Sequence, residues 1–280
     1  MKSNKGGFTF IDLFSGIGGF HSGCAMAGGT CLLASDIDKV ANQTYYNNYG
    51  IEPKGDIYEI PSEQIPDFDL LCAGFPCQTF SQIGQKGAFD DERGLLIFQV
   101  IRVLKDKQPK AFILENVRNL KSIQKGAVFQ VIMKELKKSG YNVWADILES
   151  KDYGTPQIRK RLFFVGVRKD IEADFQFPAP IPLKYTFSEV MGGETERDYS
   201  FTIRIGGRRS GINNRFNWDA YVVDGKVRYI TPEECLLLHG FPRTFKLAGN
   251  ESQRYHQVGN SVSVFIVNEI VKKLQSLNVI

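Results

Sequence analysis

The sequence predicts an α/β fold in which a mainly parallel β-sheet includes a closing antiparallel strand and is followed by a second, smaller domain. Two features of the first part of the chain predict the sheet: short apolar runs rich in β-branched and aromatic residues recur there, and amphipathic helical patterns separate most of them. Strands that alternate with helices in this way form parallel sheets with crossover helices. The expected strands are Phe8–Phe14, Thr30–Ser35, Asp69–Phe75, Lys110–Val117, Tyr141–Leu148 and Arg161–Val167.

Two helices between these strands are indicated by apolar residues that recur at the spacing of one helical face. One helix is expected between residues 94 and 107, and the other ends before Gly140. Their apolar faces consist of Leu96, Val100, Val103 and Leu104 in the first helix and of Phe129, Ile132, Met133 and Leu136 in the second. The last two strands are joined by a polar stretch without a helical pattern, so we expect them to pair antiparallel.

The pattern changes near residue 177, where prolines cluster and a glycine- and arginine-rich stretch follows. We place a domain boundary here, because such changes in composition mark connections between domains. The first domain is expected over residues 1–176 and the second over residues 177–256, with a hairpin that turns at Asp224-Gly225. A C-terminal amphipathic helix over residues 257–280 is expected to pack back on the first domain.

Composition bounds the function only weakly. The chain has 280 residues, of which 42% are hydrophobic, and this is enough to bury a large core. Its net charge of +4 fits a polyanion as partner, as it also fits many proteins without one. No apolar run approaches the ~20 residues of a membrane span and no secretory signal is visible, so we expect a soluble, cytoplasmic protein without membrane contact. The five cysteines show no metal-ligand spacing, so we expect neither disulfides nor a metal.

A glycine-rich turn follows the first expected strand. Residues 12–20 read DLFSGIGGF, in which Gly16 and Gly18 allow the backbone to approach a ligand and direct helix amides towards it. Asp36 follows the second strand, where a carboxylate can accept hydrogen bonds from a ribose diol. Nicotinamide and adenosylmethionine enzymes share this pattern, and a glycine turn without a ligand shows it too. Asp56, at the expected edge of a further strand, meets an adenine amino group or lies in a solvated loop.

Reactive side chains stand at the ends of later strands. Cys77 follows an apolar strand in the segment GFPCQTFS, and a thiol in such an exposed turn needs a lowered pKa to act as a nucleophile. Glu115 closes the next apolar strand, where burial raises the pKa of a carboxyl group and suits it to share a proton with a base ring nitrogen. Arg159 and Arg161 lie two residues apart in QIRKR and therefore share one face of an extended segment, unless they form a solvated basic turn.

Taken in order, these motifs resemble one family over nearly the whole chain: the cytosine-5 DNA methyltransferases of bacterial restriction-modification systems. Several short patterns in the family's order are far more specific than any single pattern. The motifs are DLFSGIGGF, SDID, GDI, GFPCQTFS, ENV, QIRKR, TPEECLLLHGFP and QVGNSV. The resemblance implies a Rossmann-like, S-adenosylmethionine-dependent methyltransferase sheet in the catalytic and cofactor-binding first domain, and a small DNA target-recognition domain in the second.

The resemblance also implies a reaction. Cys77 adds to C6 of a cytosine flipped out of double-stranded DNA, and C5 then becomes nucleophilic enough to take the methyl group of S-adenosylmethionine. Glu115 holds N3 and the exocyclic amine, while Arg159 and Arg161 engage the ring oxygen and the nearby catalytic loop. The products are 5-methylcytosine and S-adenosylhomocysteine.

The cofactor contacts implied by the resemblance come from most of these motifs. Phe14 packs against the adenine, Gly16 and Gly18 lie beneath the methionine part, and Asp36 binds the ribose. The other implied cofactor contacts are Ile37, Asp56, Ile57, Gly74, Pro76, Leu96, Asn260 and Ser261. Many relatives have a glutamate and an aromatic residue where this chain has Asp36-Ile37, which leaves the stacking contribution of that position open.

Two segments are expected to contact DNA. A small, polar loop over residues 78–87 is expected to close over the flipped base, with Gln78, Ser81 and Gln82 as its contacts. The other segment lies between QIRKR and TPEECLLLHGFP, and its arginine forks suit guanine edges and phosphates. The arginines concerned are Arg204, Arg208, Arg209 and Arg215. We expect a monomer, with a cognate restriction endonuclease that acts on the same site.

Three other functions are compatible with parts of this sequence. A cytosine-5 methyltransferase that acts on tRNA shares the motifs around Cys77 and Glu115, but its relatives usually lack an arginine-rich insert of this kind. A regulator that binds adenosylmethionine without catalysis would be expected to have lost Cys77, Glu115 or Arg159. A nicotinamide oxidoreductase leaves GFPCQ, ENV and QVGNSV unexplained. DNA methylation is therefore the favoured hypothesis.

Overall fold

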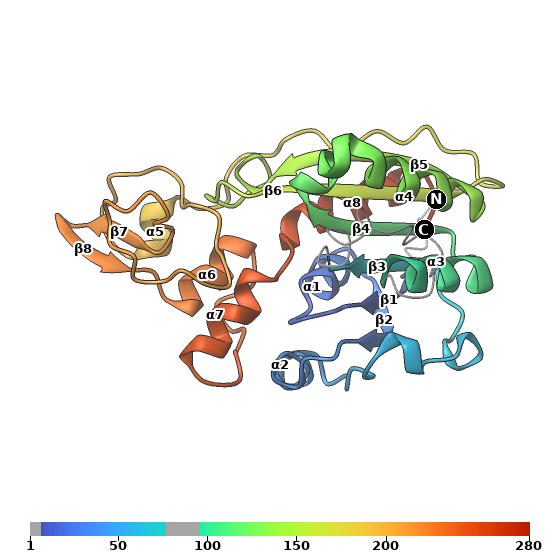
Figure 1. The fold of residues 1–280 in the computed structure, drawn as a ribbon, viewed down its shortest axis with the longest axis horizontal. Coiled ribbons are helices and arrows are strands. Elements are labelled where there is room, and N and C mark those ends of the chain that lie inside the picture. The colour runs from blue at the N-terminus through green and yellow to red at the C-terminus, as the bar shows by residue number, and fades with distance from the viewer. Residues whose placement is uncertain (1–6, 77–95) are drawn as a thin grey trace, which may run out of the picture.

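The computed structural model describes residues 7–76 and 96–280. A wide sheet carries helices on both faces, and a smaller group of elements stands at one end of it (Figure 1). The smaller group consists of α5 (Phe187–Met191), β7 (Ala220–Val223), β8 (Lys226–Tyr229), α6 (Pro232–His239) and α7 (Glu251–Gly259). The chain passes through the sheet first, then through the smaller group, and returns to the sheet at its C-terminus.

Within the described residues, six strands form the sheet, and they confirm the six predicted from the sequence. They are β1 (Thr9–Leu13), β2 (Thr30–Ser35), β3 (Leu70–Gly74), β4 (Ala111–Val117), β5 (Tyr141–Glu149) and β6 (Lys160–Arg168). Their order across the sheet is β2-β1-β3-β4-β6-β5, and β6 runs antiparallel to both of its neighbours. The predicted antiparallel pairing of the last two strands is thus confirmed, and β6 lies inside the sheet while β5 forms its edge.

Helices cover both faces of the sheet, and side chains alternate between two cores along each strand. Phe112 and Leu114 of β4 face one core with helices α3 and α4, whereas Ile113 faces the other core with α1 and α8. Burial on both faces explains why the central strands are continuous apolar runs in the sequence. The helices of this part are α1 (Gly19–Met26), α2 (Lys39–Tyr49), α3 (Leu96–Lys107), α4 (Ala127–Lys138) and α8 (Val264–Ser276). Short 3-10 helices lie at Ile57–Glu59, Ser62–Gln64, Arg118–Lys121, Ile123–Gly126 and Ser150–Asp152.

The C-terminal helix packs back on the sheet, as the sequence predicts, but it is shorter than expected. α8 begins at Val264, so the prediction of one helix over residues 257–280 is wrong at its start. Residues 257–259 end α7, and a turn follows them. α8 crosses α1 closely: a Cβ atom on Gly23 would lie 2.6 Å from the Val267 side chain.

The smaller group has its own apolar core, which joins the sheet through the start of α8. Trp218 and Tyr221 are almost fully buried there, and Phe265 of α8 packs against the same cluster. The predicted hairpin is confirmed: Asp224 and Gly225 have φ angles of 49° and 71°, as a tight two-residue turn requires. The boundary near residue 177 stays a prediction, and apolar residues just beyond it, such as Ile181, still pack on the sheet side.

Candidate active site

The candidate site is a cavity of about 740 Å³ at the carboxyl ends of the parallel strands β1 to β4. Open α/β sheets bind their ligands at this edge, and ligand sites measure roughly 300–1,000 Å³. The cavity collects most of the predicted cofactor and catalytic residues. Those that line it are Phe14, Gly16, Asp36, Ile37, Asp56, Ile57, Gly74, Pro76, Leu96, Glu115, Arg159, Arg161 and Asn260.

The glycine-rich turn bends sharply at the end of β1. Phe14 has a φ of 54°, a left-handed conformation that costs energy for a residue with a bulky side chain, and strain of this kind is concentrated at functional sites. Gly16 follows with a φ of 51°, and a Cβ atom there would meet nothing within 4 Å. Gly18 lies behind the cavity wall, where the Tyr49 hydroxyl donates to its carbonyl at 2.8 Å. The turn therefore presents Gly16, rather than Gly18, to the cavity.

Asp36 stands directly beyond β2 and joins it to the glycine turn. Its carboxylate accepts hydrogen bonds from the backbone N–H groups of Gly16 and Asp38, both at 2.8 Å. Burial raises the pKa of Asp36, although these N–H groups favour its ionised form. Each carboxylate oxygen can accept a second hydrogen bond, so a ligand hydroxyl can still bind. The next side chain, Ile37, is 74% exposed at the rim of the cavity.

Asp56 and Ile57 reach the cavity from a loop, since the third strand edge expected beside Asp56 is absent at this point of the described chain. Lys54 forms a single parallel bridge with Ser35 at the end of β2. Asp56 then begins a 3-10 helix, because its carboxylate accepts from the N–H of Tyr58 at 3.0 Å. Ile57 is almost fully buried.

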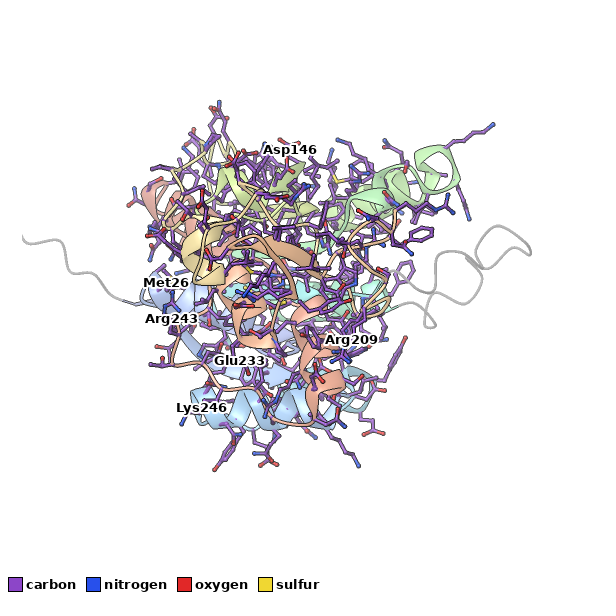
Figure 2. All side chains as sticks on the ribbon, turned by 90° about the vertical axis from the view of Figure 1, so that its left-hand side faces the viewer. Met26, Asp146, Arg209, Glu233, Arg243 and Lys246 are labelled. Carbon is purple, nitrogen blue, oxygen red and sulfur yellow. The ribbon has the colours of Figure 1, made fainter. Side chains whose placement is uncertain are left out.

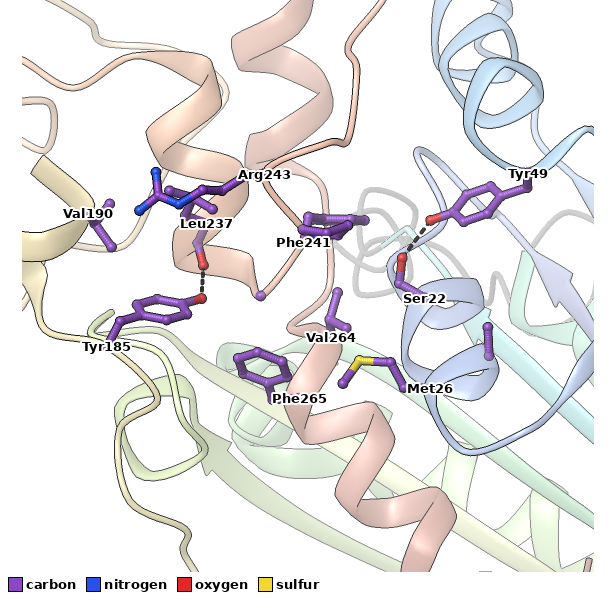
Figure 3. A pocket seen from close by; sticks show the side chains of 13 residues that line it. Ser22, Met26, Tyr49, Tyr185, Val190, Leu237, Phe241, Arg243, Val264 and Phe265 are labelled. Carbon is purple, nitrogen blue, oxygen red and sulfur yellow. Dashed lines mark hydrogen bonds between the residues drawn. The ribbon is translucent and has the colours of Figure 1, made fainter. Parts of the chain in front are cut away.

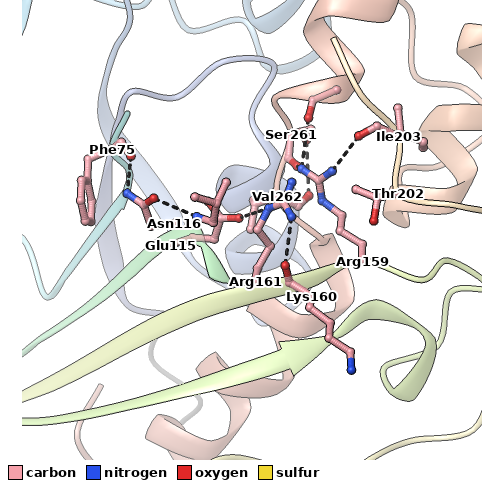
Figure 4. Close-up of polar contacts among 12 residues, drawn as sticks. Phe75, Glu115, Asn116, Arg159, Lys160, Arg161, Thr202, Ile203, Ser261 and Val262 are labelled. Carbon is pink, nitrogen blue, oxygen red and sulfur yellow. Dashed lines mark hydrogen bonds and ion pairs between the residues drawn. The ribbon is translucent and has the colours of Figure 1, made fainter. Parts of the chain in front are cut away.

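Glu115 and Arg161 form an ion pair on the opposite wall. Arg161 Nε lies 2.9 Å from Glu115 Oε1, and both side chains are largely buried (Figure 4). Burial raises the pKa of Glu115, and the positive charges of Arg161 and Arg159 oppose this shift. Burial likewise lowers the pKa of Arg161, which Glu115 opposes. The pair thus combines a carboxyl group whose pKa is raised with a guanidinium that fixes the orientation of that carboxyl group.

Arg159 also lines the cavity, but its guanidinium donates to the main chain. The acceptors are the carbonyls of Ile203 at 3.2 Å, Gly259 at 3.1 Å and Ser261 at 2.7 Å (Figure 4). Ser261 contributes this carbonyl behind Asn260, which lines the cavity itself. Arg159 and Arg161 therefore share one side of the segment, as predicted, and have different partners.

Asn116 is a site residue that the sequence analysis did not single out. Its side-chain amide donates to the Phe75 carbonyl at 2.8 Å, and it is almost fully buried. It therefore holds the chain just before Pro76, an exposed residue on the cavity wall. A polar residue near the end of the apolar run that forms β4 was the available signal. Cys77 comes next in the chain, and the predicted site residues Cys77, Gln78, Ser81 and Gln82 lie outside the described residues.

The smaller group of elements contributes a second residue that the sequence analysis missed. Ile205 is 51% exposed and lines the cavity, beside the exposed Arg204. An apolar residue between arginine and two glycines was its only sequence signal. From α7 and its C-terminal end, His256, Gln257 and Gly259 also reach the cavity.

The predicted DNA-contacting arginines differ in how many contacts they make to other side chains of the protein. Arg208 pairs with Glu251 at 3.1 Å, and its guanidinium lies 4.1 Å from the centre of the Tyr255 ring. Arg209 is more exposed and lies 3.8 Å from Glu251. Arg215 is exposed and stacks 4.5 Å from the centre of the Phe216 ring. Arg204, Arg209 and Arg215 are therefore more available to a ligand than Arg208.

A second cavity of about 650 Å³ lies between α1, α6 and the start of α8, and it contains none of the predicted site residues (Figure 3). Its walls are mainly apolar, and Ser22 and Tyr49 bond to each other at 2.7 Å on one side of it. Met26 and Arg243 line this cavity. Figure 2 shows both on the left of the view, whereas Arg209, one of the predicted DNA contacts, lies on the right. The predicted chemistry therefore belongs to the larger cavity.

Within residues 7–76 and 96–280, no three His, Cys, Asp or Glu side chains are grouped so that they could hold a metal ion. The helices in the same ranges include none that is long and apolar enough to span a membrane.

Comparison with known proteins places the chain in one family. It matches C-5 cytosine-specific DNA methylase over residues 8–204 and 194–276. It is 37% identical to the Type II methyltransferase M1.ScrFI of Lactococcus lactis subsp. cremoris, over 95% of this chain and 78% of that protein. It is 37% identical to M.NlaX of Neisseria lactamica, over 96% of each chain. M.HhaI of Haemophilus parahaemolyticus is 33% identical, over 96% of this chain and 95% of its own length.

Solved structures share the fold. S. pombe Dnmt2 methyltransferase superposes with a TM-score of 0.76 at 22% identity, and covers 97% of this chain and 99% of its own. A Spodoptera frugiperda DNMT2 mutant gives a TM-score of 0.75 at 20% identity, with 96% and 99% covered. The fold agrees with that of these methyltransferases, and the sequence match extends over most of the chain. The chain therefore belongs to the C-5 cytosine-specific DNA methylase family and is an enzyme of that family.

Proposed function

We propose that this enzyme transfers a methyl group from S-adenosylmethionine to C5 of a flipped cytosine in a specific site of double-stranded DNA. The observation that carries the proposal is a single cavity that holds both halves of such a reaction. Glu115 and Arg161 line one wall, and the glycine turn with Asp36 lines the other. Family membership supplies the reaction class, and this arrangement supports the assignment of residues to it.

The residues of the glycine-turn wall fit S-adenosylmethionine. Gly16 leaves its backbone open to the cavity, and a flat adenine can pack beside the half-buried Phe14. The Asp36 carboxylate can accept a ribose hydroxyl while it holds the turn in place. The proposed cofactor wall is completed by Ile37, Asp56, Ile57, Gly74, Pro76, Leu96 and Asn260. Gly18 and Ser261 remain proposed cofactor contacts, and their carbonyls accept hydrogen bonds from Tyr49 and Arg159. When bound, the cofactor supplies an electrophilic methyl group on a positively charged sulfur.

The other wall is suited to activate a cytosine. Burial raises the pKa of Glu115 above its ordinary value, which suits this carboxyl group to carry a proton to N3 while Cys77 adds to C6, so that negative charge does not build up on the ring. Arg161 holds this carboxyl in place at 2.9 Å. After C5 is methylated, the C5 proton passes to water, Cys77 leaves as a thiolate, and Glu115 takes back the N3 proton, which restores the aromatic ring. Cys77 is the residue after Pro76, which lines the same cavity.

The cytosine must leave the duplex to reach this cavity, at a cost of about a few kcal/mol. We propose that the elements within residues 177–256 form the target-recognition domain that offsets this cost, against a catalytic and cofactor-binding domain over residues 1–176. Gln78, Ser81 and Gln82 remain proposed contacts to the flipped base, and Arg204, Arg208, Arg209 and Arg215 remain proposed contacts to the DNA. Ile205 adds an apolar contact where this domain meets the cavity.

We further propose that the enzyme is the modification partner of a restriction-modification system. Its relatives are named Type II methyltransferases, which supports this role. It would act as a monomer in the cytoplasm, beside a nuclease that cuts the same site.

The test is bisulfite sequencing of plasmid DNA from cells that express the enzyme. We expect protected cytosines at one recurrent short sequence, and none in cells that express Cys77→Ser. Total tRNA from the same cells is treated in parallel. Protection confined to tRNA would overturn the assignment of DNA as the substrate.

A further inference from the structure

Arg159 joins three parts of the chain that are far apart in the sequence. The residue is 2% exposed and directly precedes β6. Its guanidinium donates to the carbonyl of Ile203 from the smaller group, and to the carbonyls of Gly259 and Ser261 in the turn after α7. A buried cation without such acceptors would be strongly destabilising, so these bonds hold the three segments together.

Each segment held by Arg159 ends in the cavity. Ile205 lies two residues beyond Ile203 and lines the cavity from the target-recognition side. Asn260 lies between Gly259 and Ser261 and lines the cavity at the proposed cofactor site. One guanidinium thus sets the distance between a residue near the flipped base and a residue near the cofactor.

The two segments also touch each other directly, at Gly259. A Cβ atom on this glycine would lie 2.8 Å from the carbonyl carbon of Arg204 and 2.9 Å from the amide nitrogen of Ile205. Backbone atoms cannot yield as the end of a flexible side chain can, so even one methyl group would push the segments apart. Both residues therefore maintain the contact between the two segments, Arg159 through its hydrogen bonds and Gly259 through its lack of a side chain.

The surroundings of Arg159 give its charge no other partner at ion-pair distance among the described residues. Burial lowers the pKa of Arg159, and Glu115, whose charge opposes this shift, pairs with Arg161 instead. His239 is fully buried nearby, and its pKa is lowered by burial and by the charges of Arg159 and Arg161, so it stays neutral. The guanidinium Nε is buried without a hydrogen-bond partner among the described residues. Its organising contacts are the three carbonyls.

We propose that Arg159 is a positioning residue that holds two segments together and so couples DNA binding to cofactor binding. One is the start of the target-recognition segment, which contains Ile203, and the other is the turn over residues 259–261 beside the proposed cofactor site. This inference rests on the proposed function. It differs from the role implied by the resemblance, in which Arg159 touches the base ring or the catalytic loop. A clamp affects cofactor binding even without DNA, whereas a contact to the base affects only turnover and DNA binding.

The experiment measures S-adenosylhomocysteine binding by calorimetry without DNA, and then duplex binding with and without S-adenosylhomocysteine at the site found by bisulfite sequencing. The variants are Arg159→Met, Arg159→Lys and Gly259→Ala. Lys160→Met is the charge control, because Lys160 is the exposed neighbour. Gly206→Ala is the steric control, because a Cβ atom there would meet nothing within 4 Å. Thermal denaturation shows which variants are folded.

We expect S-adenosylhomocysteine to bind about tenfold more weakly to Arg159→Met, because this variant loses its charge-assisted hydrogen bonds. We expect a similar loss in Gly259→Ala, because the added methyl group pushes the two segments apart. Arg159→Lys should recover part of this loss, and both controls should stay within about twofold of the wild type. In the wild type, S-adenosylhomocysteine should tighten duplex binding by about fivefold or more, within the range of site-to-site coupling, and Gly259→Ala should lose most of this effect.

Two outcomes overturn the inference and are separable from failure of the proposed function. If the folded Arg159 variants lower kcat while S-adenosylhomocysteine binds as in the wild type, Arg159 acts on the base and not as a clamp. If Gly259→Ala keeps both affinities and their coupling, the contact does not connect the sites. Wild-type protein that binds no S-adenosylhomocysteine would instead refute the proposed function. If Arg159→Met does not fold, Gly259→Ala and Arg159→Lys decide.

Discussion

Arg161 Nε lies 2.9 Å from Glu115 Oε1 although the two residues are not directly opposite in the sheet. In the β4–β6 register, Glu115 is opposite Phe163 and Val117 is opposite Arg161. The long arginine side chain spans this diagonal, which is within reach for neighbouring strands. The pair places an acid that binds protons readily beside the carboxyl end of β3, where Cys77 follows in the chain.

The ionisation of Glu115 is expected to oppose folding, so Glu115→Gln should change how stability depends on pH. The folded pKa of Glu115 lies above its ordinary value of 4.5, mainly because of burial. Its contribution to stability is therefore complete below the unfolded pKa and is lost as the pH rises through the folded pKa. Urea denaturation is measured from below pH 4.5 to above the folded pKa of Glu115. As the pH increases, the free energy of unfolding of Glu115→Gln should rise relative to that of the wild type. A constant difference between the two proteins would refute the raised pKa.

Glu115→Gln should also slow methyl transfer by about 10²- to 10⁴-fold, the usual contribution of a general acid. Tritium transfer from labelled S-adenosylmethionine to plasmid DNA measures this loss. S-adenosylhomocysteine affinity should be unchanged, because Glu115 lies on the opposite wall from the glycine turn.

Phe14→Ala and Asp36→Ala should each weaken S-adenosylmethionine binding by about 1–3 kcal/mol, as loss of aromatic burial or of a charge-assisted hydrogen bond does. Calorimetry measures both, with the exposed neighbour Lys39→Ala as the control. Asp36→Asn should lose less than Asp36→Ala, since an amide oxygen can still accept the N–H bond from Gly16 that holds the turn. Unchanged affinity in both alanine variants would refute this wall as the cofactor site.

Asn116→Ala should lower kcat more than it changes the affinity for S-adenosylmethionine. The substitution leaves the Phe75 carbonyl without its side-chain donor and releases the chain that leads to Pro76. We also expect a loss of about 1–3 kcal/mol in the free energy of unfolding, as for other buried hydrogen bonds. Asn142→Ala, on the edge strand β5, is the control. Wild-type turnover in Asn116→Ala would show that this hydrogen bond does not position the catalytic segment.

The four arginines of the target-recognition segment should separate into two groups. Arg208 is held by Glu251 and Tyr255, so Arg208→Ala should weaken methylation of all sites alike. At least one of Arg204→Ala, Arg209→Ala and Arg215→Ala should relax discrimination at a single base pair by about 1–3 kcal/mol. Methylation of a library of single-mismatch sites at several salt concentrations distinguishes a base contact from a phosphate contact. Uniform losses in all four variants would place the reading surface elsewhere.

Local patterns in the sequence predicted the elements of the sheet because apolar runs and glycine turns have short-range causes. The hairpin at Asp224-Gly225, for example, turns on two adjacent residues whose φ angles are 49° and 71°. The sequence predicts too early a start for the C-terminal helix, because the helical apolar pattern continues across Gly259 and Asn260, whereas α8 begins at Val264. The turn there is instead fixed by distant contacts, above all from Arg159.

The composition of the site was predicted better than its contacts. Motifs identify Glu115, Arg159 and Arg161, but the partners of the arginines depend on the register of β6 and on a turn about 100 residues later. Asn116 could have been found as a polar residue in a buried strand. Ile205 could not be found with certainty, because its place at the cavity follows from how its segment packs against Gly259 at the end of α7, a contact between residues far apart in the sequence.

The central claim, a covalent Cys77–C6 adduct, is tested most directly by trapping with DNA that carries 5-fluorocytosine at the target. Fluorine at C5 cannot leave as a cation, so the adduct cannot resolve after methyl transfer. With S-adenosylmethionine present, we expect a denaturation-resistant complex of protein and DNA, whose cross-linked peptide contains Cys77 in mass spectrometry, and no complex with Cys77→Ser. Absence of the complex on a duplex that the wild type methylates, or attachment through another residue, would contradict the mechanism.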